Sequence, residues 1–283
     1  MTTLLLHEDL SIDTKERSNT YSITTSVFIK SSEEPIENNI KSTVRKTFIQ
    51  KDQIGHLFSV EVLERIQSNK EGIFSLEDKL NIIQHKLVLY TDQKGEIISI
   101  VNRGEIAEAW YDQQKILQKT FENDIEDIHV ILEGIHQIIH DENEFLSLVK
   151  KSDIITLLFP PIYQQHITSE VSISQRKIFA DFFDTTDLPF KVDTKVIAIH
   201  EVTKGYQIVR SGSLDTQLFD NEMATSLLGN LFKVHPYNIN IDANYFEAQD
   251  LKENGDIEEG IFFLNIEVPE IYSYRQISKL TSM

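Results

Sequence analysis

Histidine and glutamate side chains recur at helical spacing between residues 126 and 140. The stripe comprises Glu126, His129, Glu133, His136 and His140, and the steps alternate between three and four residues. Imidazoles one helical turn apart can ligate one metal ion, and Glu-x-x-His pairs occur in helical di-metal sites. The stripe therefore defines a candidate metal site at His129, Glu133, His136 and His140, with a metal-dependent enzyme as one alternative function.

Two features of this stripe argue against a metal centre. The segment from His136 to His140 has the frame of the zinc-protease motif but carries Gln137, not the glutamate that acts as the base in that chemistry. On a helical wheel the stripe borders the apolar face that contains Ile128 and Leu132, where partly buried histidines are ordinary. A solvated boundary stripe is the simpler interpretation, so we expect no metal ion and no other cofactor.

Motifs for phosphate binding and nucleophilic catalysis are missing from the sequence. It has no Gly-x-Gly-x-x-Gly, no Gly-Lys-Ser/Thr and no Gly-x-Ser-x-Gly segment. The segment from Asp250 has the start of a calcium-loop pattern, but Ile261 stands where a bidentate glutamate belongs, so a hairpin turn is expected instead. No catalytic residue is assigned and a non-enzymatic protein is favoured. An enzymatic function stays open, because a catalytic pair of carboxylates can be assembled from distant segments of the chain.

Acidic residues strongly outnumber basic residues in this chain of 283 residues. It has 45 Asp and Glu against 27 Lys and Arg, a net charge of −18, and no cysteine. Residues 104–149 contain 11 acidic and two basic residues, and residues 215–260 contain ten acidic and two basic residues. The charge disfavours nucleic acids and anionic membranes as partners. The lack of cysteine excludes disulfides, thiol catalysis and cysteine-ligated metals.

The two acidic segments favour a binding function. We expect a soluble binding or assembly protein whose acidic helical surfaces contact a basic protein partner, as an inhibitor, an immunity-type protein or a scaffold component would. The oligomeric state stays open. The candidate partner-binding residues are Glu105, Glu108, Asp112, Glu126, Asp127, Glu253, Asp256, Glu258 and Glu259.

A carrier that encloses an apolar ligand under a curved sheet is a further alternative. Aromatic side chains would line its cavity, and a filled core at these positions would count against it. The candidate residues are Phe179, Phe182, Phe183, Phe262 and Phe263.

Hydrophobic periodicity predicts the elements that hold these residues. Apolar residues alternate with polar ones towards both ends of the chain, as in strands, whereas spacings of three and four dominate the middle. Apolar runs at 86–91 and 96–101 flank Asp92-Gln93-Lys94-Gly95, which predicts a hairpin.

The clearest helix is expected at 103–121. Asn102 precedes it as an N-cap and forms a capping-box-like pair with Glu105 three residues later. Another helix, at about 221–232, is expected to bury Leu231 along with its other apolar residues.

Short turns between neighbouring strands imply antiparallel pairing. The predicted fold class is therefore α+β, with antiparallel β-meanders and packed helices arranged as two similar halves or around one large curved sheet. The predicted organisation is a strand-rich half at 1–122 ending in a long helix, a helical connector at 123–160, and a second β-β-β-α-β-β half at 161–283.

Neither a signal peptide nor a transmembrane segment is recognisable. The chain begins Met1-Thr-Thr-Leu-Leu-Leu, which is shorter than the apolar region of about 7–15 residues in a secretory signal. No stretch approaches the roughly 18 apolar residues of a spanning helix. We therefore expect a cytoplasmic protein without membrane insertion.

Overall fold

The computed structural model describes residues 17–31, 34–80, 83, 85–163, 172–183, 186–199, 205–235 and 239–283. The strands are β1 (Arg17–Lys30), β2 (Ile36–Lys51), β3 (Gly55–Gln67), β4 (Lys86–Asp92), β5 (Ile97–Ile100), β6 (Ile173–Phe183), β7 (Thr186–Ile199), β8 (Tyr206–Leu214), β9 (Asp242–Leu251), β10 (Ile257–Val268) and β11 (Tyr272–Ser282). The helices are α1 (Gly72–Leu80), α2 (Arg103–Phe121), α3 (Ile128–His140), α4 (Glu142–Lys151), α5 (Asp153–Leu158) and α6 (Asn221–Phe232).

The strands form one antiparallel sheet of 11 strands, hydrogen-bonded in the order β5-β4-β3-β2-β1-β11-β10-β9-β8-β7-β6. The predicted α+β class, with meanders and packed helices, was therefore wrong, because a large open sheet dominates the fold and strands occupy far more of the described chain than helices. Pairing of β1 with β11 makes the sheet continuous, and Thr25 Oγ1 donates to Ser278 Oγ at 3.0 Å beside that pairing. Such long-range pairing uses backbone groups, which leave no pattern in the sequence.

Compact packing divides the chain into two units. One contains β6–β11, α6 and β1 from Thr24 onward, and the other contains β1 up to Ile23, β2 from Asn39 onward, β3–β5 and α1–α5. The predicted boundaries after residues 122 and 160 remain predictions.

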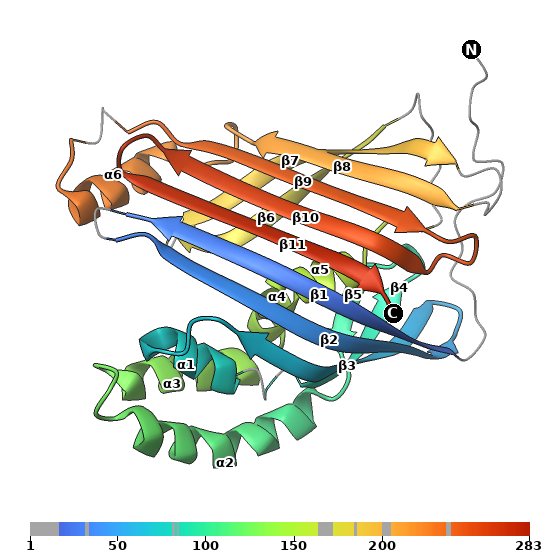
Figure 1. The fold of residues 1–283 in the computed structure, drawn as a ribbon, viewed down its shortest axis with the longest axis horizontal. Helices are drawn as coiled ribbons and strands as arrows, with labels where there is room; N and C mark the ends of the chain where they lie inside the picture. Colours follow the sequence, from blue (N-terminus) through green and yellow to red (C-terminus); the bar gives the residue numbers. More distant parts are fainter. Residues whose placement is uncertain are drawn as a thin grey trace. The chain divides into compact units, whose positions relative to one another are not determined.

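In the first unit the edge strand β6 lies against strands that are not its hydrogen-bonded neighbours. Phe182 packs edge-on against Tyr274 of β11, with ring centroids 5.3 Å apart, and Phe179 packs against Tyr245 of β9 at 6.0 Å. In Figure 1, β6 passes behind β9 and β10, and α6 lies at one end of these strands. The buried faces of β6 and β9–β11 therefore enclose an aromatic core.

In the second unit the β4–β5 hairpin confirms the predicted turn. Asp92 Oδ1 accepts hydrogen bonds from the backbone N–H groups of Lys94 and Glu96. Gly95 has a φ of +91°, and an added Cβ there would lie 2.7 Å from the Tyr163 ring. Glycine is therefore required both by the backbone conformation and by the close approach of Tyr163.

The helix predicted at 103–121 is confirmed as α2. Its expected capping box was wrong, because Asn102 makes no side-chain cap. The Asn102 amide instead accepts from Val88 N at 2.8 Å and donates to Lys86 O at 2.9 Å. The residue thereby attaches the start of α2 to β4. The helices α1 and α3 lie beside α2 (Figure 1).

Candidate functional site

A pocket of about 400 Å³ lies between the first half of α2 and the chain that leads into β4. Both elements belong to the same compact unit. Its lining residues are Ile83, His85, Lys86, Asn102, Glu105, Ile106, Ala109, Trp110 and Gln113. We call it the α2 pocket.

The floor of the α2 pocket is apolar and its rim is polar. Ile106 and Trp110 are one helical turn apart and both are buried. His85, Lys86 and Glu105 are exposed, so their polar groups lie at the opening. The hydrogen bonds of Asn102 to β4 hold α2 in place against this opening. An apolar floor with a few polar groups is the usual lining of a small-molecule site.

Trp110 is an unusual element of the pocket wall. It is 1% exposed, and its indole Nε1–H has no hydrogen-bond partner among the described residues. Buried indole N–H groups normally find an acceptor, and leaving one unpaired costs about 1–3 kcal/mol. Trp110 is also the only tryptophan in the sequence, so its fluorescence reports on this wall alone.

A buried charge cluster lies in the other unit, on the enclosed face of the sheet. The Glu247 carboxylate accepts from Lys177 Nζ at 3.0 Å and from Arg210 Nη1 at 2.7 Å. Gln249 Nε2 donates to it at 3.4 Å, and Lys177 also contacts the Tyr245 hydroxyl at 2.9 Å. Lys177 comes from β6 and the others from β8 and β9, so the cluster connects the edge strand to the strands that it covers.

The environment of the charge cluster shifts the pKa of two of its members. Burial lowers the pKa of Lys177, although attraction to Glu247 opposes this effect. Burial by itself would raise the pKa of Glu247, but attraction to Arg210 and Lys177, together with hydrogen bonds, brings it below its usual value. Glu247 is therefore ionised at neutral pH and holds two cations.

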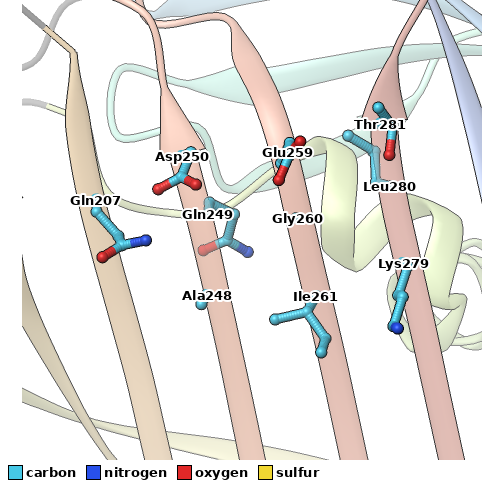
Figure 2. A pocket seen from close by; sticks show the side chains of 10 residues that line it. All are labelled: Gln207, Ala248, Gln249, Asp250, Glu259, Gly260, Ile261, Lys279, Leu280 and Thr281. Atoms are coloured by element: carbon cyan, nitrogen blue, oxygen red, sulfur yellow. The ribbon is translucent and has the colours of Figure 1, made fainter.

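A second pocket, of about 270 Å³, lies over β8–β11 (Figure 2). Gln207, Asp250, Glu259 and Thr281 form one row across the four strands, and Asp250 is directly opposite Glu259. Like charges directly opposite each other on adjacent strands are destabilising. This row brings the predicted partner-binding residue Glu259 beside Asp250, which the sequence analysis had interpreted only as part of a turn.

The histidine stripe lies on α3 and the turn before it. The rings of His136 and His140 are 4.1 Å apart, and His140 Nδ1 contacts the backbone oxygen of His136 at 2.8 Å. The described part of the chain holds no group of three or more His, Cys, Asp or Glu residues suited to a metal ion. His129, Glu133, His136 and His140 are therefore not brought together as a metal centre.

The predicted acidic residues are divided between the two units. Glu105, Glu108 and Asp112 are exposed on α2, and Glu126 and Asp127 are exposed in the turn before α3. The second group lies on the β9–β10 hairpin and not on a helix; it consists of Glu253, Asp256, Glu258 and Glu259. Contact of these residues with a basic partner stays a prediction.

Four of the five phenylalanines proposed for a carrier cavity have ring contacts in the aromatic core, namely Phe179, Phe182, Phe183 and Phe262, whereas Phe263 is half-buried on β10. Phe179, Phe183 and Phe262 are buried, and Phe262 stacks edge-on against Tyr245 at 5.9 Å. None of the five candidates lines the α2 pocket or the β8–β11 pocket. Sequence reasoning missed the α2 pocket because no pattern marks the segment before β4 as the neighbour of Ile106 and Trp110.

No α-helix within the described ranges is long and apolar enough to cross a membrane. The N-terminal segment used to argue against a signal peptide lies outside the described residues.

No protein-family model matches the sequence, and a search of curated proteins gives no match. Among solved structures, one similar chain is that of lipovitellin, from a study of its lipid–protein interactions, with a TM-score of 0.45 and 7% identity. The match covers 94% of this chain but 25% of the lipovitellin chain. This protein thus spans about a quarter of the length of that structure.

Two further structures are similar at lower scores. DynF from the dynemicin biosynthesis pathway of Micromonospora chersina has a TM-score of 0.23 and 4% identity, covering 100% of this chain and 88% of its own. A DUF1329 family protein from Desulfovibrio piger has a TM-score of 0.19 and 7% identity, covering 93% and 84%. All three TM-scores lie below 0.5, so these similarities assign no function to this protein.

Proposed function

We propose that this protein binds a small, mainly apolar molecule in the α2 pocket. The observation that carries the proposal is the pocket itself, with a volume of about 400 Å³ and a floor made by Ile106 and Trp110. Pockets that bind small molecules typically measure about 300–1,000 Å³ and have mainly apolar linings with a few polar groups.

The composition of the floor and rim supports an apolar ligand. Burial of apolar ligand surface against Ile106 and Trp110 gives roughly 25 cal/mol per Å², while the rim residues His85, Lys86 and Glu105 remain in contact with water. This proposal shares the apolar ligand of the carrier alternative, but it places the ligand at α2 and not among the five phenylalanines under the sheet.

The test uses the neutral fluorescent probe N-phenyl-1-naphthylamine. We expect saturable binding with a rise in probe emission, and a matching change in the emission of Trp110, because the indole lies in the wall of the pocket. Absence of saturable binding would overturn the proposal.

A filled pocket provides the matched control. Ala109 is exposed on α2 and lines the pocket, so Ala109→Phe places a ring in it without disturbing a buried residue. Gln118→Phe puts the same ring on an exposed position of α2 outside the pocket lining. Probe affinity should fall in the first variant and stay at the wild-type level in the second; equal affinity in both would show that the probe binds elsewhere.

A further inference from the structure

We infer that the ligand of the α2 pocket carries an uncharged hydrogen-bond acceptor, such as the oxygen of a ketone, an ester or an amide, that pairs with Trp110 Nε1–H. This inference rests on the proposed function, since it specifies the chemical class bound at the same site. It separates oxygen-bearing apolar molecules from pure hydrocarbons.

The indole N–H of Trp110 is a buried donor without a partner among the described residues. Native proteins pair nearly all buried donors, so each exception needs an explanation. The side chain of Asn102, another polar residue of the wall, is already engaged by Val88 N and Lys86 O. Trp110 therefore has a donor and no assigned acceptor among the described residues of the pocket. An acceptor on the ligand would satisfy it.

The charges at the rim favour a ligand without net charge. Lys86 and Glu105 carry opposite charges and both lie at the opening, so neither sign dominates there. The floor beneath them contains Ile106 and Trp110 and offers no counter-ion, and burial of an unpaired charge is strongly unfavourable. A neutral oxygen can accept a hydrogen bond from the indole without that penalty.

The indole nitrogen is closed off from solvent by the side chains around it. Pairing with a ligand oxygen therefore requires a small shift of the indole or of its neighbours. Gln113 lines the same pocket and is only half-buried, so its side chain can change rotamer to allow such a shift. The shift changes the environment of the single tryptophan, which makes the pairing measurable.

The test compares two probes, 2-acetylnaphthalene and 2-ethylnaphthalene. They have the same carbon skeleton, but the first has a carbonyl group where the second has a methylene group. Both are measured by displacement of N-phenyl-1-naphthylamine from the wild-type protein and from Trp110→Phe, which keeps an aromatic ring and removes the N–H donor. The ratio of the two affinities within each protein cancels the different solubilities of the probes. We expect the preference for the ketone to fall roughly five- to tenfold in the variant, the value of one hydrogen bond.

A second measurement needs no variant. The single indole ¹H–¹⁵N signal of the wild-type protein should move downfield on addition of 2-acetylnaphthalene and not on addition of 2-ethylnaphthalene.

The outcomes distinguish failure of the acceptor inference from failure of the proposed function. The acceptor inference would be overturned if the ratio of the two probe affinities were the same in the wild-type protein and in Trp110→Phe. It would also be overturned if the indole signal responded equally to 2-acetylnaphthalene and 2-ethylnaphthalene. Either result would leave the proposed function standing. An internal water molecule as the true partner of Trp110 would give that result. Failure of N-phenyl-1-naphthylamine to bind the wild-type protein would overturn the proposed function itself.

Discussion

Replacement of Glu247 tests whether the buried charge cluster holds the edge strand β6 in place. Glu247→Gln keeps the shape of the side chain and removes its charge. In the wild-type protein the Glu247 side chain is 0% exposed, and the side chains of Arg210 and Lys177 are 5% and 19% exposed. The variant leaves these two cations without their shared anion.

The expected loss is large because the remaining charges stay buried. Removal of one partner from a buried ion pair costs about 3–5 kcal/mol, since the other charge is left without compensation. Lys177 keeps its hydrogen bond to the Tyr245 hydroxyl in the variant, so we expect a value near the lower end of that range. With a urea m-value of roughly 3 kcal/mol/M, the unfolding midpoint should fall by about 1 M.

Urea denaturation followed by circular dichroism measures this change. Glu258→Gln is the matched control, because Glu258 is exposed on β10 and its replacement should alter stability by less than about 0.5 kcal/mol. A shift of the midpoint no larger for Glu247→Gln than for Glu258→Gln would refute the reasoning.

The same variant predicts a change in pH dependence. The pKa of Glu247 is lower in the folded protein than its usual value of 4.5, so the unfolded chain takes up a proton first as the pH falls. The contribution of Glu247 to stability is therefore present above pH 4.5 and is lost on further acidification. Glu247→Gln should remove this part of the acid sensitivity, and an unchanged acid profile would contradict the assigned pKa direction.

His56, Gly95 and the acidic face of α2 can each be tested by substitution. His56 is 2% exposed, and burial lowers its pKa below 6.5. Stability should therefore fall as the pH drops below 6.5, and less so in His56→Leu, as thermal melts at pH 7.5 and 5.5 would show. Gly95→Ala should cost at least about 1–2 kcal/mol in urea because of its positive φ and contact with Tyr163, whereas Gly104→Ala, with open space around it, should be neutral or stabilising. If a basic partner binds α2, the double variant Glu108→Gln, Asp112→Asn should recover less of that partner in a pull-down, and added salt should also reduce the recovery. Recovery that changes with neither salt nor the substitutions would count against this contact.

Local features of this protein were predictable from its sequence. The β4–β5 turn and α2 were correct because their signals, a Gly-containing loop and apolar residues at helical spacing, lie within a few residues of each other. Features that depend on more distant neighbours were missed. Asn102 has the composition of an N-cap, but β4 supplies the groups that it binds. Leu231 has the spacing of a buried helix residue but is 66% exposed.

At the α2 pocket too, local features could be predicted from the sequence, whereas contacts between distant segments could not. Trp110 is buried on α2, as apolar residues at helical spacing usually are. Its unpaired N–H and the pocket beside it depend on which chain segment lies next to α2. Ile83, His85 and Lys86 precede Trp110 by 24 to 27 positions, and no motif connects them to the helix.

The sequence by itself determined the acidic charge, the absence of cysteine chemistry, the main hairpin and the long helix, because each of these depends on composition or on neighbours along the chain. Only the tertiary structure decided the continuous sheet, the burial of Glu247 between Lys177 and Arg210, and the position of the α2 pocket. Lys177 and Glu247 are 70 residues apart, and Thr25 and Ser278 are 253 apart. Contacts over such separations form through backbone pairing and close packing, which select among many arrangements compatible with the same local pattern.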